Sequence, residues 1–277
     1  MDTKIDKVIL ITGATDGIGK EAALQLAAWG ATILVHGRNF ERAGSVAEEI
    51  RKTTGSTKIE PVVGDFASLR QVRAMADDVL KRYGRLDVLI NNAGVYMKRR
   101  ELTEDGFETT FQVNHLAHFL LTHLLLDLLK KSAPSRIINV SSMAHSNAKP
   151  DWENLQGEKK FGGYGAYSLS KLANILFTYE LAERLNGRGI TVNCLHPGVI
   201  STKLLHTGFG GFGGSSVKKG AETIVYLARS PEGGKATGKY FVWSKAVDSA
   251  SVTYDRNLWK EFWSLSEKQA GIISQKE

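Results

Sequence analysis

Short apolar runs alternate along the chain with longer stretches in which apolar residues recur every three or four positions. Several runs, such as Val-Ile-Leu-Ile at 8–11, are apolar on both faces, which is typical of strands in a sheet covered by helices on both sides. We expect strands at Val8–Thr12, Thr32–His36, Lys58–Val63, Leu86–Asn91, Arg136–Ser141, Thr191–His196 and Lys239–Val242. The helical period predicts helices at Ile18–Trp29, Phe40–Thr53, Leu69–Tyr83, Phe107–Lys131, Tyr164–Leu185, Lys218–Ala228 and Asn257–Ala270.

Strands that alternate with helices predict the α/β class, here a Rossmann-type doubly wound parallel β-sheet with helices on both faces. The chain shows no internal boundary and no repeat, so we expect a single domain over 1–277. The glycine-rich segment 200–217 follows the sixth strand and is expected to be a flexible substrate lid, with a loose surface loop as the alternative. Residues 254–277 are expected to be a C-terminal helical extension that packs against the domain or another subunit.

The composition is that of an ordinary globular protein, with 42% hydrophobic and 23% charged residues, which excludes a disordered or coiled-coil chain. The net charge of +7 comes from scattered basic pairs without interleaved aromatic residues, so we expect no nucleic-acid partner. A single cysteine, Cys194, excludes a disulfide framework and multi-cysteine metal sites. His115, His118 and His123 share one predicted helix, but no carboxylate or cysteine joins them, so we expect no metal site.

The chain enters its first strand at Val8 without an apolar leader, so we expect no signal peptide. Its longest uncharged stretch, 109–126, contains polar residues such as Asn114 and His118 and would cross a bilayer poorly. We therefore expect a buried helix at this position, no integral membrane segment or anchor, and a soluble cytoplasmic protein.

A glycine-rich turn connects the first predicted strand to the first predicted helix, with the sequence Thr-Gly-Ala-Thr-Asp-Gly-Ile-Gly at 12–19. Glycines let a pyrophosphate approach backbone N–H groups at a helix N-terminus, where the helix dipole also favours negative charge. Glu21 stands where the serine or threonine of a P-loop would hold magnesium, which excludes that motif. The turn predicts a dinucleotide site at Thr12, Gly13, Gly17, Ile18 and Gly19.

The second predicted strand ends Val-His-Gly-Arg at 35–38, without the carboxylate that binds the ribose 2′-hydroxyl of NAD. Arg38 can instead pair with a 2′-phosphate and stack on adenine, so the sequence favours NADP over NAD. A surface arginine is the alternative interpretation of Arg38. Asp16 argues the other way, because it places negative charge near the phosphates.

Tyr167 and Lys171 lie four residues apart and would share one face of a helix. An ammonium about 4 Å from a phenol, at an effective dielectric of about 20, is worth about 4 kcal/mol, or about three pKa units. We therefore expect Lys171 to lower the pKa of Tyr167 into a range useful for proton transfer. Ser142 follows the strand before this helix, and Asn91–Gly94 ends another strand in the same crevice, which distinguishes this pair from an accidental one.

Five ordered motifs, TGATDGIG, NNAG, VSS, YSLSK and HPG, resemble those of the short-chain dehydrogenase/reductase family, and the resemblance covers nearly the whole chain. The stretches FQVNHLAHFLLTHLLLDLL, RIINVSS, AYSLSKLANILFTYELAERL and LHPGVI are similar to the retinol dehydrogenase-like branch, which includes relatives of protochlorophyllide reductase. Many retinol dehydrogenases have an N-terminal membrane anchor, which we do not expect here.

The resemblance implies a catalytic role for four residues. Tyr167 would be the general acid/base, and Lys171 would lower its pKa and hold the nicotinamide ribose. Ser142, twenty-five residues before Tyr167, would orient the substrate, and Asn114 would complete a proton relay. The implied cofactor contacts are the pyrophosphate cradle at Gly13, Gly17, Ile18 and Gly19, the adenosine contacts Asp65 and Asn91, the adjoining Ala93 and Gly94, and the nicotinamide contacts Pro197, Gly198, Val199 and Thr202.

These observations together predict an NADP-preferring oxidoreductase that transfers hydride between nicotinamide and an alcohol or carbonyl group. The segments expected around the substrate are rich in apolar residues, which favours a retinoid-, steroid- or lipid-like aldehyde or ketone: Tyr96, Met97, Trp152, Phe161, Tyr164, Leu204 and Phe209. Two alternatives stay open, a non-catalytic NAD(P)-binding sensor or scaffold and a double-bond reductase of the protochlorophyllide-reductase type. A homodimer through the helices at 107–131 and 164–185 is also compatible with the resemblance.

Overall fold

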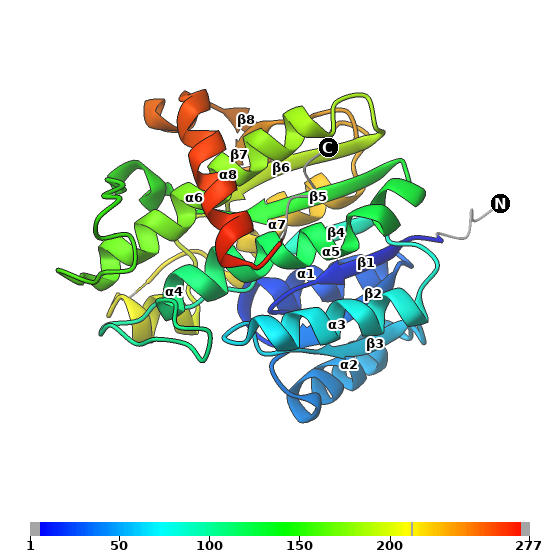
Figure 1. The fold of residues 1–277 in the computed structure, drawn as a ribbon. Coiled ribbons are helices and arrows are strands. Elements are labelled where there is room, and N and C mark those ends of the chain that lie inside the picture. The colour runs from blue at the N-terminus through cyan, green and yellow to red at the C-terminus, as the bar shows by residue number, and fades with distance from the viewer. Residues whose placement is uncertain (1–5, 212, 273–277) are drawn as a thin grey trace.

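The computed structural model describes residues 6–211 and 213–272, and these contain one eight-stranded sheet (Figure 1). The strand order is β3-β2-β1-β4-β5-β6-β7-β8, and all neighbours are parallel except the last pair. The strands are β1 Val8–Ile11, β2 Thr32–Gly37, β3 Ile59–Val63, β4 Val88–Asn91, β5 Ser135–Val140, β6 Ile190–His196, β7 Lys239–Val242 and β8 Lys245–Val247. This order, with β1 beside both β2 and β4, confirms the predicted doubly wound α/β fold in one domain.

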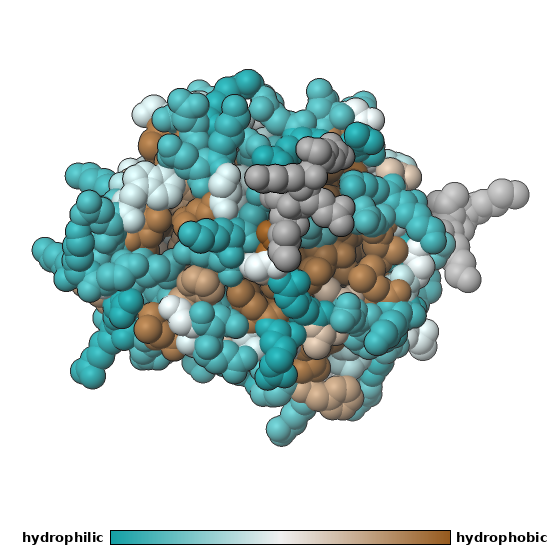
Figure 2. Space-filling model, in the orientation of Figure 1, coloured by the Kyte–Doolittle hydropathy of each residue, from teal (hydrophilic) through white to brown (hydrophobic). Residues whose placement is uncertain are grey.

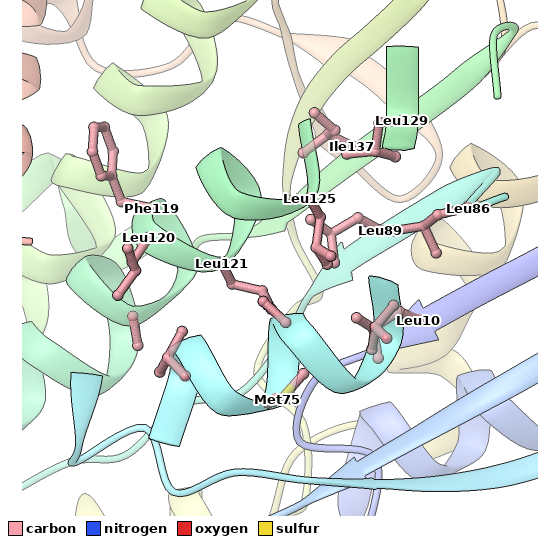
Figure 3. Packing of buried hydrophobic residues seen from close by; sticks show 14 of the residues in the cluster. Leu10, Met75, Leu86, Leu89, Phe119, Leu120, Leu121, Leu125, Leu129 and Ile137 are labelled. Carbon is pink, nitrogen blue, oxygen red and sulfur yellow. The ribbon is translucent and has the colours of Figure 1, made fainter. Parts of the chain in front are cut away.

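Helices cover both faces of the sheet because successive apolar side chains of each strand point to opposite sides. Ile9 and Ile11 belong to the core under α1 (Gly17–Ala28), α2 (Phe40–Thr54) and α7 (Val217–Arg229). Leu10 belongs to the core under α3 (Leu69–Arg82), α5 (Ala117–Lys131) and α6 (Gly163–Arg184). Figure 3 shows this second core, in which Met75 of α3 and Leu121 and Leu125 of α5 pack over Leu10 and Leu89.

The C-terminal helix α8 (Arg256–Gln269) packs on α6 and buries Trp259, Phe262 and Trp263, as predicted. The predicted extension reaches residue 277, and its residues 273–277 lie outside the described part of the chain. Figure 2 shows apolar side chains gathered around the helices on this side of the molecule, with hydrophilic residues over most of the remaining visible surface. α8 therefore covers part of the surface of α5 and α6, the two helices through which the resemblance would allow a homodimer.

Three features differ from the predicted elements. The predicted helix at 107–131 is divided into α4 (Thr109–Phe111), a π-helical turn at Gln112–Leu116 and α5. The edge strand β8 was not predicted, because its three residues are all exposed and show no apolar pattern. Short helical turns at Met143–Asn147, Leu204–Gly208 and Ser251–Tyr254 were not predicted either.

The long uncharged stretch lies in α4, the π-helical turn and α5, and is mostly buried. None of the helices in the described residues has both the length and the apolarity that a membrane crossing needs.

The parallel register brings the carboxyl ends of four strands to one edge of the sheet. Ile11 of β1 lies beside Ile90 of β4, and Asn139 of β5 lies between Asn91 of β4 and Cys194 of β6. The segments that follow these strands contain most of the predicted site residues, and ligands bind at this edge in open α/β sheets.

Candidate active site

The glycine turn at 12–19 packs against the segment that follows β4. Gly13 has a positive φ of 63°, and a Cβ at this position would lie 2.7 Å from the Cα of Ala93. A Cβ on Gly19 would collide with the Asn92 side-chain amide and with the carbonyl of Gly13. Both glycines are therefore required by close backbone approach, and the two segments form one wall of the crevice.

The first turn of α1 fits an anionic group. Its first backbone hydrogen bond runs from Lys20 to Asp16, at 3.3 Å, so the N–H groups of Ile18 and Gly19 have no acceptor within the helix. The Asp16 carboxylate caps the helix by accepting from the Gly17 N–H at 2.7 Å. Thr202 approaches from the segment after β6, with its methyl carbon 3.4 Å from the position of a Cβ on Gly17. Two helix N–H groups and the Thr202 side chain therefore meet where a dinucleotide pyrophosphate would lie.

His36, to which the sequence pattern assigned no role, fixes the conformation of this turn. Its Nδ1 accepts a hydrogen bond from the Gly13 N–H at 3.0 Å, and its Nε2 donates to the Gly64 carbonyl at 2.8 Å. Burial lowers the pKa of His36 to about 4, so the ring is neutral at pH 7 and held as one tautomer. Gly13 therefore contributes its backbone conformation, while its N–H is already engaged. A histidine inside an otherwise apolar strand was the available signal.

Thr12 connects the glycine turn to the segment after β4. Its hydroxyl oxygen accepts from the N–H groups of Asn92 and Ala93, at 2.8 and 3.0 Å. His118 Nδ1 lies 2.9 Å from the Asn114 carbonyl and donates to it, so His118 Nε2, 2.9 Å from the Thr12 hydroxyl, accepts the Thr12 proton. Burial lowers the pKa of His118 to about 3, which keeps this arrangement through neutral pH.

The predicted adenosine residues lie in two different environments. Arg38 is exposed at the end of β2, and Asp65 is partly buried after β3, where its carboxylate accepts from the Ala67 N–H at 3.0 Å. The Asn91 amide faces the interior instead, and donates to Thr122 and Asn139 at 2.9 and 2.8 Å. Any contact between Asn91 and a cofactor would therefore involve its backbone.

Three of the four predicted catalytic side chains meet between β5 and α6. The Ser142 side chain lies next to the Tyr167 hydroxyl, and Tyr167 is only 6% exposed. The Lys171 ammonium lies 5.5 Å from the centre of the Tyr167 ring and donates to the Val140 carbonyl at 3.1 Å. It also lies 3.6 Å from the position of a Cβ on Gly94. The phenol, the hydroxyl and the ammonium therefore share one buried site.

The direction of the Tyr167 shift is opposite to the prediction. Burial raises the pKa of Tyr167 to about 12, and the hydrogen bond with Ser142 opposes this only in part. Burial also lowers the pKa of Lys171 to about 8. The prediction assumed an ammonium about 4 Å from the phenol in a partly solvated site, whereas Lys171 lies over the ring and both groups are removed from water. Tyr167 is therefore protonated at neutral pH.

Asn114, in the π-helical turn, is fully buried and fixes the segment after β4. Its side chain accepts from the Val95 N–H at 2.7 Å and donates to the Val95 carbonyl and to Ser170, both at 3.0 Å. Its backbone carbonyl accepts from His118 and from the Asn174 amide, at 2.9 and 3.0 Å. The Asn114 side chain therefore connects the segment after β4 to α6, and its backbone carbonyl connects α5 to α6.

The segment after β6 places an aromatic cover over Tyr167. The Phe209 ring is edge-on to Tyr167, with centroids 5.0 Å apart, and it also contacts Tyr96 at 4.3 Å. His206 orders this segment through the Ser201 hydroxyl at 2.9 Å and the Gly211 carbonyl at 3.0 Å. Phe212, within the predicted lid at 200–217, lies outside the described residues.

The segment after β6 also contains the predicted nicotinamide contacts Pro197, which is buried, Gly198, which is partly buried, and Val199, which is exposed. Gly198 has a φ of 97°, and a Cβ there would lie 2.5 Å from the Trp243 ring, so only glycine fits. The described residues include no group of three or more His, Cys, Asp or Glu side chains arranged to hold a metal ion.

Comparison with known proteins agrees with this geometry. Residues 7–209 match the family described as short chain dehydrogenase. Human retinol dehydrogenase 13 is 42% identical over 281 aligned positions, which cover 96% of this chain and 85% of that protein. This similarity confirms the predicted relation to retinol dehydrogenases.

Two solved structures have the same fold. An uncharacterised protein from Mycobacterium paratuberculosis superposes with a TM-score of 0.80 at 31% identity, covering 96% of this chain and 93% of that one. A short chain dehydrogenase from Escherichia coli CFT073, complexed with NADPH, superposes with a TM-score of 0.72 at 28% identity, covering 86% and 97%. The chain therefore belongs to the short-chain dehydrogenase/reductase family and is an NAD(P)-dependent oxidoreductase that acts on CH–OH groups.

Proposed function

We propose that this protein is an NADP-preferring reductase of apolar aldehydes or ketones, and catalyses the reverse oxidation of the corresponding alcohols. The observation that carries the proposal is the buried Tyr167 hydroxyl, which lies next to the Ser142 side chain and under aromatic rings. A neutral phenol in a dry site can give its proton to an oxygen that becomes an alkoxide, and this is the reductive direction.

Each polar residue then has one task. A bound nicotinamide cofactor supplies or accepts the hydride. Ser142 donates a hydrogen bond to the carbonyl oxygen and orients it toward the Tyr167 hydroxyl, which transfers the proton. Lys171 holds positive charge beside the phenol, and its amine is within reach of a ribose hydroxyl bound against Gly94. Asn114 keeps the backbone after β4 in place for that contact.

The proposed substrate class follows from the side chains around the Tyr167 hydroxyl. The Tyr96 and Phe209 rings contact the Tyr167 ring, and Tyr164 contacts Phe209. Met143 and Val199 are exposed apolar residues on neighbouring segments. The retinol dehydrogenase relative adds a retinoid alcohol or aldehyde to the first compounds to test.

A panel of polar and apolar aldehydes, ketones and alcohols, followed by nicotinamide absorbance, tests this assignment. We expect kcat/KM to rise with the apolar area of the compound. Cofactor binding without hydride transfer across the panel would contradict the proposal and favour the sensor or scaffold alternative. Reduction of a carbon–carbon double bond alone would favour the protochlorophyllide-reductase alternative.

The raised pKa of Tyr167 predicts different pH profiles for the two directions. Oxidation needs the phenolate as a base, and its fraction rises tenfold per pH unit at every pH well below about 12. We expect kcat/KM for alcohol oxidation to rise about tenfold per unit from pH 6 to pH 8, whereas kcat/KM for carbonyl reduction should not rise. Initial rates in both directions measure this, and a flat oxidation profile would contradict the assignment of Tyr167 as the base.

Replacement of Arg38 tests the cofactor preference. A charge-assisted hydrogen bond to a 2′-phosphate is worth about 1.5–3 kcal/mol, so Arg38→Ala should weaken NADPH binding by about ten- to a hundredfold. NADH lacks that phosphate, and its affinity should change less than about threefold. Titration of both cofactors measures the ratio, with Lys52→Ala, an exposed change farther along α2, as the matched control. An unchanged NADPH/NADH affinity ratio would show that Arg38 is only a surface residue.

A further inference from the structure

His145 lies in the helical turn at Met143–Asn147, directly after Ser142, and is buried. Its Nδ1 is 2.6 Å from the Ser142 carbonyl, and its Nε2 is 3.0 Å from the backbone nitrogen of Ala250. The Tyr240 ring packs edge-on against it, with centroids 5.1 Å apart. Both ring nitrogens are therefore engaged, and the partners lie in segments that are far apart in the sequence.

These partners define one tautomer of His145. A carbonyl can only accept, so Nδ1 carries the proton and donates to Ser142. The Ala250 N–H can only donate, so Nε2 accepts. The Ser142 carbonyl also accepts from the His145 N–H at 3.1 Å, and the Ser142 hydroxyl oxygen accepts from the Ala144 N–H at 3.2 Å. The proton of the Ser142 hydroxyl is therefore left available to a substrate carbonyl bound beside Tyr167.

The contacts of His145 complete a closed circuit that begins and ends on α6. Tyr179 of α6 is hydrogen-bonded to Ser249 at 2.7 Å, and Ser249 precedes Ala250. Ala250 donates to His145, His145 donates to the Ser142 carbonyl, and the Ser142 side chain lies next to Tyr167, three helical turns before Tyr179 on the same helix. Helix α6 therefore holds both ends of this series of contacts. Tyr167 lies beside Ser142, and Tyr179 holds the segment that contacts His145.

We propose that His145 is a positioning residue that keeps the Ser142 hydroxyl directed at Tyr167, anchored by the N–H of Ala250. This inference rests on the proposed role of Ser142 in carbonyl reduction. It assigns no proton transfer to His145, whose imidazole contacts the backbone of Ser142. It also gives the segment at 249–250, far from the crevice in sequence, a part in the geometry of the reaction.

Two substitutions separate the two bonds of the ring. The amide nitrogen of His145→Asn can take the place of Nδ1 and keep the bond to Ser142, whereas His145→Gln reaches the place of Nε2 and keeps only the bond to Ala250. Loss of one hydrogen bond costs about tenfold, so H145Q should lower kcat for reduction by about tenfold or more. H145N, which loses only the bond to Ala250, should keep kcat within about threefold of wild type. The KM values for both cofactor and substrate should change less than about threefold in each variant.

A third variant tests the anchor without substituting His145 itself. Ala250 has a φ of −58°, which proline adopts, so Ala250→Pro removes the N–H donor and places a ring carbon against His145 Nε2. Because this displaces the His145 ring from Ser142, we expect A250P to lower kcat by about tenfold, like H145Q. If H145Q does not fold, as judged from its melting temperature, the comparison of A250P with wild type decides, and a wild-type kcat in A250P would overturn the proposed anchor.

Combination with Ser142→Ala tests whether His145 acts through the serine. In the S142A background, H145Q should lower the remaining rate by less than about twofold, because the group it positions is gone. The same tenfold loss in both backgrounds would show a purely structural role and overturn the inference. Full activity of S142A would overturn the proposed function of Ser142 itself, whereas an impaired S142A with a fully active H145Q would overturn only the positioning role.

Discussion

Tyr167→Phe is expected to lower kcat by about a hundred- to ten-thousandfold, the range that one positioned proton donor contributes, while cofactor affinity changes little. The phenyl ring still fills the buried site and still contacts Phe209 and Tyr96, so the change removes only the hydroxyl. Reduction of an aldehyde found active in the panel, followed by nicotinamide absorbance, measures kcat. Cofactor affinity is measured separately by titration.

Tyr164→Phe is the matched control for this experiment. Tyr164 lies one turn earlier on α6 and is 46% exposed, and its hydroxyl accepts a hydrogen bond only from Asn147, at 3.1 Å. We expect Tyr164→Phe to keep kcat within about threefold of wild type. A Tyr167→Phe protein that keeps more than a tenth of the wild-type kcat would remove the phenol from the reaction, and the site would then be a nucleotide-binding crevice without an assigned proton donor.

Lys171→Met is expected to abolish turnover and, at the same time, to stabilise the cofactor-free protein at neutral pH. Burial lowers the pKa of Lys171 from 10.5 to about 8, which corresponds to about 3 kcal/mol against the folded state when the amine is charged in both states. Loss of the hydrogen bond to the Val140 carbonyl offsets about 1 kcal/mol of this. The net gain in the free energy of unfolding should be about 2 kcal/mol, measured by urea denaturation at pH 7.

The sign of the pH dependence provides a second test of Lys171. Below pH 8 the amine is charged in both the folded and the unfolded protein, so the wild type carries the full cost. Between pH 8 and 10.5 the folded protein loses its proton first, so the wild type gains stability relative to Lys171→Met, and above pH 10.5 the variant should be the less stable because it lacks the hydrogen bond to Val140. Lys218→Met, at an exposed position, should change stability by less than about 0.5 kcal/mol at every pH. A less stable Lys171→Met protein at pH 7 would contradict the expected cost of burying the Lys171 charge.

The fold and much of the site could be predicted because they depend on local patterns. The apolar runs placed the seven parallel strands, and parallel strands bring their carboxyl ends together, so Gly13, Ser142 and Tyr167 were assigned to one crevice before any contact was known. The exposed edge strand β8 has no such pattern, and the π-helical turn at Gln112–Leu116 lies within an unbroken helical period.

What could not be predicted depends on contacts between distant residues. The pKa of Tyr167 was expected to fall because the spacing to Lys171 was visible, whereas the burial that raises it comes from Phe209 and the surrounding core. His36 and His145 were not assigned their roles, because their partners at Gly64 and Ala250 are brought to them only by the folded sheet and the C-terminal segment. Asn91 was expected to contact adenosine, and its strand position alone did not show that its amide faces the interior.

The Phe209 ring lies edge-on to the Tyr167 ring, so we expect a compound that binds beside the Tyr167 hydroxyl to displace it. The binding free energy of a compound is then that of its own apolar contacts less the cost of moving Phe209, and this cost is the same for every compound. A small polar aldehyde bears that cost without recovering it, whereas a long hydrocarbon replaces the lost contacts with its own. Because this cost is shared, it cancels from the ratio of two affinities and lowers every affinity alike, so only compounds with enough apolar surface are expected to bind measurably.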